Sequence, residues 1–203
     1  MTMENQSDQN IIPQQYTGTS MDALEERISA STEEAITLFN RTATKLLSIN
    51  DWGKYAGMSA FQLMDPHGIK AERAAEEGDF IRIDIPGPGT HTGKGYDWVR
   101  IQEIKSINEG ECQILAIIVR PCAHPLEKEG KTAHFLKDTA TSTFIVKRNG
   151  VRITAEEHGR NEVPNTETGS VYDKGRNFIV GMAGKLGLSY PQWKSLVKGL
   201  LKD

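Results

Sequence analysis

A glycine-dense segment with a Gly-Lys pair, DIPGPGTHTGKGYDW at residues 84–98, has the residue types of a phosphate-binding loop. Such a loop reads G-x-x-x-x-G-K-[ST] between a strand and a helix, because its backbone amides and lysine bind phosphates and its hydroxyl binds magnesium. Here Pro88 stands at the first glycine position, and Gly95 follows Lys94 in place of serine or threonine. The residues after Gly95 have the pattern of a strand rather than a helix. We therefore interpret this segment as a loop between two strands that binds no nucleotide.

The histidines and cysteines do not form a recognisable metal motif. No two histidines have the H-E-x-x-H spacing that places both imidazoles on one face of a helix. The two cysteines lack the C-x-x-C spacing of zinc and redox motifs. These residues are His67, His91, His124, His134 and His158, and Cys112 and Cys122. We therefore expect neither a bound metal nor a cofactor.

A run of charged residues, EEHGRNE at residues 156–162, contains groups that could act as a general acid and base. Glu157 and His158 are the candidates, because proton transfer requires titratable groups in one pocket that shifts their pKa values. This alternative makes the protein a cyclase- or hydrolase-like enzyme. The preferred interpretation is that the run forms the polar, solvated end of a hairpin, so the sequence leaves open whether the protein is an enzyme.

The length of 203 residues favours one globular domain, and the net charge of −3 does not indicate a nucleic-acid partner. No apolar run approaches the roughly 20 residues that span a bilayer. Residues 1–20 are rich in Gln, Asn, Ser and Thr, so we expect a flexible N-terminal tail, followed by a single domain over residues 21–203. The N terminus lacks the pattern of a secretory signal, and we expect a soluble, cytoplasmic protein. The sequence does not indicate an oligomeric state.

One amphipathic helix is predicted over residues 31–47. Ser31 and Glu34 have the spacing of a capping box, and apolar residues then recur at intervals of three and four. These residues are Ile36, Phe39, Ala43, Leu46 and Leu47. A short strand is predicted before this helix, at residues 22–31, and a short helical turn after it, at residues 48–57.

The next hundred residues have the patterns of strands. Residues 79–85, DFIRIDI, alternate between apolar and polar types, and residues 112–120, CQILAIIVR, form the continuous apolar run of a central strand covered on both faces. Two further strands are predicted at residues 59–65 and 96–106. Residues 69–79, which lie between the predicted strands 59–65 and 79–85, are compatible with either a helical turn or a strand.

A β-hairpin is predicted over residues 142–159. The Asn-Gly pair at residues 149–150 is the favoured sequence of a two-residue hairpin turn. Pairing across this turn sets Val146 opposite Ile153 on a face that packs inward. The opposite face, which includes Ile145, is predicted to be mostly solvated.

Two helices are predicted near the C-terminal end. Residues 171–186 place an apolar stripe, which includes Phe178 and Met182, on one side of a helix. Residues 189–202, SYPQWKSLVKGLLK, form a last helix, in which Ser189 and Gln192 have the spacing of a capping box.

The order of these elements resembles the START/polyketide-cyclase-like (SRPBCC) superfamily, which has the helix-grip fold. The segment ALEERISASTEEAITLF is similar to the family's first strand, turn and first helix, and INDWGKYAG stands where members often have a tryptophan-containing short helix. The segment TSTFIVKRNGVRITAEEHG, followed by a helix, is similar to the last hairpin and the gripping helix. The resemblance implies an α+β fold in which a curved antiparallel sheet of about six to seven strands wraps around a C-terminal helix.

Members of this superfamily commonly keep a hydrophobic cavity between the sheet and the C-terminal helix. The resemblance therefore implies a START-like protein that binds a small hydrophobic or amphipathic molecule, or a lipid, without a cofactor. The expected ligand-binding residues are Tyr96, Trp98, Arg100, Phe144, Phe178 and Met182. Among them, Arg100 would orient an acidic group of the ligand. A further alternative is an interaction module that resembles the co-chaperone branch of the superfamily and exposes an apolar patch.

Overall fold

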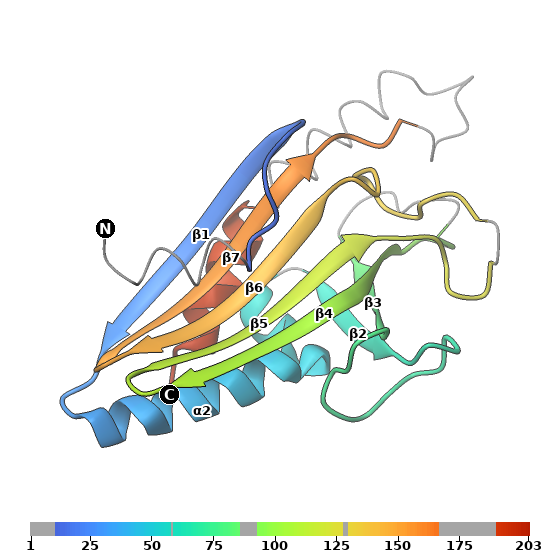
Figure 1. Cartoon of the computed structure of the whole chain (residues 1–203). Helices are drawn as coiled ribbons and strands as arrows, with labels where there is room; N and C mark the ends of the chain where they lie inside the picture. The colour runs from blue at the N-terminus through green and yellow to red at the C-terminus, as the bar shows by residue number, and fades with distance from the viewer. Residues whose placement is uncertain (1–10, 58, 86–92, 128–129, 167–189) are drawn as a thin grey trace.

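The computed structural model describes residues 11–57, 59–85, 93–127, 130–166 and 190–203, which fold around a seven-stranded antiparallel sheet (Figure 1). The strands are β1 (Thr19–Ile28), β2 (Ala60–Met64), β3 (Phe80–Asp84), β4 (Asp97–Glu109), β5 (Cys112–Pro121), β6 (Thr141–Asn149) and β7 (Arg152–Glu162). The described helices are α2 (Thr32–Leu47), the 3-10 turn η1 (Ile49–Asp51), α3 (Gly53–Ala56) and a helix over residues 190–200, which we call the C-terminal helix. The strands lie in the order β1-β7-β6-β5-β4-β3-β2.

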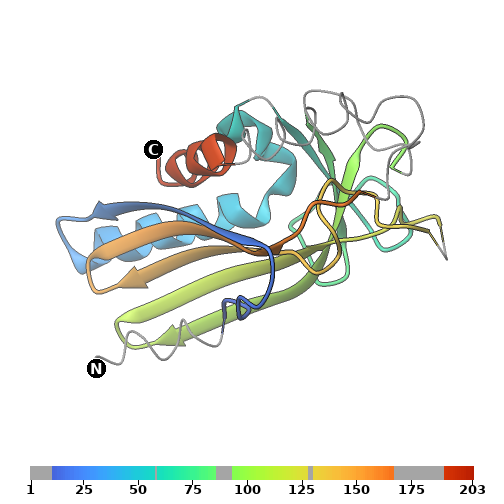
Figure 2. The ribbon, with the colours of Figure 1, turned by 90° about the horizontal axis from the view of Figure 1, so that it is seen from above.

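Helix α2 and the C-terminal helix cover the same face of the sheet, which we call the inner face (Figure 2). The sheet curves, so that β2 and β3 stand at an angle to β1 and β7. One cluster of buried side chains joins this face to both helices. The expected α+β fold, a curved antiparallel sheet with a C-terminal helix, is therefore confirmed. No described helix is both long enough and apolar enough to cross a membrane.

The predicted capping box begins α2, and the predicted apolar side faces the core: Phe39 and Leu46 are buried, and Ala43 and Leu47 pack against the core. Ser31 Oγ accepts a hydrogen bond of 3.2 Å from the Glu34 N–H, as the spacing predicts. The buried residues of the helix are Ala35, Leu38, Phe39, Thr42 and Leu46. Ile36, which was expected on the apolar side, is 37% exposed. The small Ala35 and Thr42 side chains lie toward the core in its place.

The hairpin between β6 and β7 forms with the predicted inner face but a different register. Val146 pairs with Ala155 rather than with Ile153, because the turn consists of Gly150 and Val151. Gly150 adopts a φ of 59°, a left-handed conformation that glycine tolerates. A shift of two residues keeps every side chain on its face, so the predicted inward face is confirmed while the predicted pairs are wrong.

The outer face of β5 is covered, as the sequence predicted, and so is the outer face of β6 at Ile145, where the sequence predicted solvent. Figure 2 shows residues 11–17, which we call the N-terminal segment, on the side of the sheet opposite the helices. Its Ile11 is 3% exposed and belongs to a buried cluster with Ile114, Ala116 and Ile145. The prediction of a flexible tail is therefore wrong for residues 11–20, because their isoleucines supply apolar surface that β5 and β6 bury. Residues 1–10 lie outside the described part of the chain.

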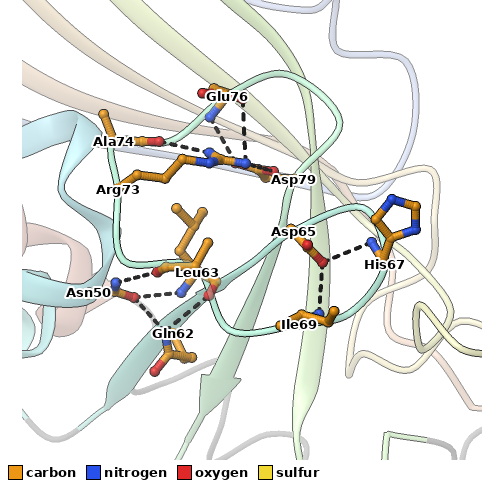
Figure 3. A network of polar contacts seen from close by, with 11 residues as sticks. Asn50, Gln62, Leu63, Asp65, His67, Ile69, Arg73, Ala74, Glu76 and Asp79 are labelled. Atoms are coloured by element: carbon orange, nitrogen blue, oxygen red, sulfur yellow. Dashed lines mark hydrogen bonds and ion pairs between the residues drawn. The ribbon is translucent and has the colours of Figure 1, made fainter.

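The long connection between β2 and β3, residues 65–79, is a loop held by polar contacts (Figure 3). The Asn50 amide donates a hydrogen bond of 2.8 Å to the Ala71 carbonyl. The Arg73 guanidinium donates two hydrogen bonds, of 2.7 and 2.9 Å, to the carboxylate of Asp79, which is 1% exposed. These contacts fix the charged segment that the sequence left open between helix and strand.

Candidate functional site

A mostly apolar cavity of about 40 Å³ lies on the inner face, between the sheet and the first turn of the C-terminal helix. Its walls include aliphatic side chains of β3, β4 and β5 and residues 134–136 and 140 of the connection before β6. Its polar lining residues are His134, Thr141, Ser142, Glu162 and Gln192. A void of this volume holds a few water molecules, so a larger ligand requires movement of the lining side chains.

Aromatic rings form one side of this cavity. The Trp52 ring lies 4.7 Å from the Phe144 ring and 5.6 Å from the Phe61 ring, centroid to centroid. The Trp193 ring of the C-terminal helix lies 5.2 Å from Phe144. The Trp52 indole N–H donates a hydrogen bond of 3.1 Å to the Leu46 carbonyl at the end of α2. The chain therefore brings the η1–α3 turn, β2, β6 and the C-terminal helix together with the end of α2 around one aromatic cluster.

The polar groups of β6 and β7 form a second side of the cavity. Thr141 is 2% exposed, and its hydroxyl has no hydrogen-bond partner within the described residues. Ser142 lines the cavity next to it. The Glu162 carboxylate accepts a long hydrogen bond of 3.4 Å from Thr19 Oγ1. The Glu162 carboxylate and the Ser142 hydroxyl thus border a largely apolar space.

A bulge in β7 turns Glu162 toward the cavity. Met21 pairs with Gly159 and Thr19 pairs with Glu162, so β7 has one residue more than β1 between the two pairs. Asn161 lies within this extra length and adopts a φ of 57°. Because a bulge shifts the alternation of side chains by one residue, the inward direction passes from Gly159 to Glu162.

The N-terminal segment holds this bulge in place. Asn161 Oδ1 accepts hydrogen bonds from the N–H groups of Tyr16 and Thr17, at 2.8 and 3.2 Å. The Asn161 N–H donates to Gln15 Oε1 at 2.8 Å, and its side-chain amide donates to the Gln14 carbonyl at 3.0 Å. A non-glycine residue rarely adopts a positive φ without such support. Residues 14–17 therefore fix the backbone that positions Glu162.

Glu157 is a second buried acid on the inner face of β7, where it pairs with Phe144 of β6. It is 0% exposed. Burial, and then the negative charge of Glu162, raises the pKa of Glu157 well above its usual range, although a side-chain hydrogen bond from Ser142 of β6 lowers this pKa in part. Burial also raises the pKa of Glu162. The inner face therefore holds two neighbouring acids whose pKa values are raised by burial.

Of the six expected ligand-binding residues, Phe144 lines the cavity, and Phe178 and Met182 lie outside the described residues. Trp98 is 3% exposed but lies on the outer face. Its indole N–H donates to the Gly93 carbonyl at 3.2 Å, and its ring centroid lies 4.7 Å from that of His124.

Tyr96 and Arg100 also lie away from the cavity. The Tyr96 ring lies 4.4 Å from the Arg82 guanidinium, in cation–π geometry. Arg100 is exposed, and its guanidinium lies 5.8 Å from the Phe80 ring. The structure thus does not place Tyr96, Trp98 or Arg100 at the cavity, because β4 directs Val99 and Ile101 into the core and the alternate residues outward.

The expected pair of Glu157 and His158 does not form, because neighbouring residues of a strand face opposite sides of the sheet. His158 lies on the outer face, where its Nδ1 is 2.6 Å from Asp22 Oδ1 and its Nε2 is 2.8 Å from Glu156 Oε2. Burial alone lowers the pKa of His158, but the hydrogen bonds and charges of Glu156 and Asp22 raise it overall. The enzyme alternative therefore loses its acid–base pair.

The Gly-Lys segment leads into a strand, as the sequence predicts. Lys94 and Gly95 adopt φ values of 53° and 93°, and β4 begins two residues later at Asp97. A phosphate-binding loop requires a helix at this point. Residues 86–92 lie outside the described part of the chain. Within the part that is described, no group of three or more His, Cys, Asp or Glu residues could hold a metal ion.

Sequence reasoning missed Trp52, Trp193 and Glu162 as cavity residues and placed the charged run in solvent. That placement is wrong for Glu157 and Glu162, which are 0% and 9% exposed. A signal for Glu157 existed, because the alternation that directs Ile153 inward extends along β7 to residue 157. No such signal existed for Glu162, because the bulge shifts the alternation.

Neither a protein-family model nor a curated protein matches this chain. Similar solved structures include the hypothetical protein jhp0584 from Helicobacter pylori, 11% identical over 88% of this chain and 86% of that chain, with a TM-score of 0.45. A START superfamily protein from Mycobacterium smegmatis is 10% identical over 90% and 99% of the two chains, with a TM-score of 0.35. A norcoclaurine synthase from Thalictrum is 11% identical over 92% and 98%, with a TM-score of 0.34.

These similarities assign no activity to this chain. Its fold follows from its own element order, a curved antiparallel sheet in the order β1-β7-β6-β5-β4-β3-β2 with a helix at the C-terminal end. A shared fold hosts many functions, so the function is argued below from the cavity.

Proposed function

We propose that this protein binds a small hydrophobic or amphipathic molecule in the inner-face cavity, without a cofactor. The observation that carries the proposal is a mostly apolar cavity with a few polar groups along one side. Ligand sites commonly combine apolar walls, which supply binding free energy, with a few polar groups, which fix orientation. The Ser142 hydroxyl and the Glu162 carboxylate are among the polar groups that line the cavity, and such groups can fix the orientation of a ligand.

A direct test measures the binding of 1-hexanol by isothermal titration calorimetry. Ala140, which is 2% exposed, lines the cavity, so an Ala140→Leu variant fills part of it. We expect this variant to bind 1-hexanol about tenfold more weakly, because losing contact with about two methylene groups costs about 1.4 kcal/mol. Trp52 and Trp193 line the cavity, so a change in tryptophan fluorescence on binding gives a second readout.

The matched control is Ala60→Leu, because Ala60 is exposed on β2 and does not line the cavity. This variant is expected to bind 1-hexanol as the unmodified protein does. Urea unfolding shows whether both variants remain folded. A folded Ala140→Leu variant that binds 1-hexanol with unchanged affinity would contradict the cavity as the binding site.

A further inference from the structure

The cavity contains a carboxylate without a cationic partner. Among the described lining residues, Glu162 is the acidic one, and none is lysine or arginine. The nearby Arg160 is directed away, since its guanidinium lies 2.7 Å from Asp22 Oδ1 and donates to the Met21 carbonyl at 3.2 Å. His134, the imidazole among the lining residues, accepts a hydrogen bond from the Leu136 N–H at its Nδ1.

The surroundings of Glu162 favour a donor-rich ligand group. Ser142 lines the cavity from the inner face of β6, where its hydroxyl also hydrogen-bonds the Glu157 carboxyl. A protonated amine has three N–H donors and no acceptor, which matches a carboxylate with a hydroxyl oxygen on the same side of the cavity. A carboxylate ligand has no donor and meets the negative charge of Glu162.

The aromatic side of the cavity also suits a cation on an apolar body. The Phe144 ring lies between the other two, 4.7 Å from the Trp52 ring and 5.2 Å from the Trp193 ring, centroid to centroid. The Phe61 ring adjoins that of Trp52. Aromatic faces attract ammonium groups, and the attraction grows when water is excluded. The same rings bury an alkyl or aryl chain.

From this arrangement we propose that the ligand of the cavity is an amphipathic amine, bound with its ammonium group on Glu162 and its apolar body against the aromatic rings. This inference rests on the proposed function and specifies the chemical class of the ligand. Glu157, which is buried on the inner face, interacts electrostatically with Glu162, so its negative charge adds to that of Glu162 when it is ionised. The binding is noncovalent and requires no co-reactant.

The test compares three ligands with the same carbon chain by calorimetry at pH 7, namely hexylamine, 1-hexanol and hexanoate. We expect hexylamine to bind about tenfold or more tightly than 1-hexanol, because a charge-assisted hydrogen bond contributes about 1.5–3 kcal/mol. Hexanoate is expected to bind most weakly. In Glu162→Gln, hexylamine and 1-hexanol are expected to bind within about twofold of each other, since the amide removes the charge and keeps the shape.

The affinity of Glu162→Gln for 1-hexanol shows that its cavity is intact, because the alcohol needs no carboxylate. The matched control is Glu109→Gln, the same chemical change at an exposed position at the end of β4. It is expected to keep the preference for the amine. Equal binding of hexylamine and 1-hexanol to the unmodified protein would overturn the inference. A preference for hexylamine that survives in Glu162→Gln would overturn it too. Either result leaves the proposed function standing. If none of the three ligands binds, the proposed function fails as well.

Discussion

Glu157 shows how one residue makes stability depend on pH. Its pKa is raised in the folded protein, mainly by burial and then by the charges of Glu162 and Asp22, while Arg160 opposes the shift. A group whose pKa rises on folding stabilises the folded state at low pH, and this contribution is lost as pH rises through the folded-state pKa. We therefore expect Glu157 to lower the free energy of unfolding as pH rises above its usual value of 4.5.

The variant Glu157→Gln tests this dependence, because glutamine keeps the shape and does not titrate. Near pH 4 its free energy of unfolding should match that of the unmodified protein, and near pH 8 it should be higher by about 2 kcal/mol, the cost of a buried charge. Urea unfolding at both pH values measures the difference. His158 titrates in both proteins, while the repulsion between Glu157 and Glu162 is lost in the variant and forms part of the measured difference. The same difference at both pH values would contradict the prediction, and Glu109→Gln serves as the exposed control.

Among the elements, the bulge of β7 depends on the left-handed conformation of Asn161. Asn161→Ala and Asn161→Gly both lose the side-chain hydrogen bonds to residues 14–17, but only glycine adopts a φ of 57° without steric cost. Both variants should be destabilised, and alanine by about 0.5–1 kcal/mol more than glycine, as measured by urea unfolding. Equal destabilisation would show that the backbone conformation is not under strain.

The connection between β2 and β3 depends on a buried carboxylate. Asp79 accepts two hydrogen bonds from Arg73 and one of 2.9 Å from the Glu76 N–H. Because Asp79→Ala removes all three hydrogen bonds of a carboxylate that is 1% exposed, we expect it to lower the free energy of unfolding by about 1–3 kcal/mol. Chemical denaturation provides the measurement.

The control for this prediction is a surface ion pair. Glu26 pairs with Arg152, and both side chains are about half exposed, at 46% and 56%. Glu26→Ala is expected to change the free energy of unfolding by less than about 1 kcal/mol. A similar effect of Asp79→Ala would mean that the polar contacts of Figure 3 do not stabilise the loop.

At the scale of the whole molecule, the class of the fold and the order of its elements could be predicted from sequence because hydrophobic periodicity is local. The alternation around Ile81 and Ile83, and the capping box at Ser31, each follow from a few neighbouring residues. The choice of Trp98 and Arg100 as cavity residues failed because β4 has both apolar and polar residues on each face. Its sequence pattern therefore does not indicate which face packs against the helices. The position of Glu162 depends on a bulge that residues 14–17 stabilise from far along the chain.

The pairing of the first strand with the last has a consequence for folding during synthesis. Thr19 pairs with Glu162, so β1 has no partner strand until β7 has left the ribosome. Contacts between such distant residues slow folding, because a long loop must close before they form. Until then β6 is an unpaired edge, which in a nascent chain can pair with the edge of another molecule. The last described strand to be made, β7, is therefore the one that joins β1 to the rest of the sheet.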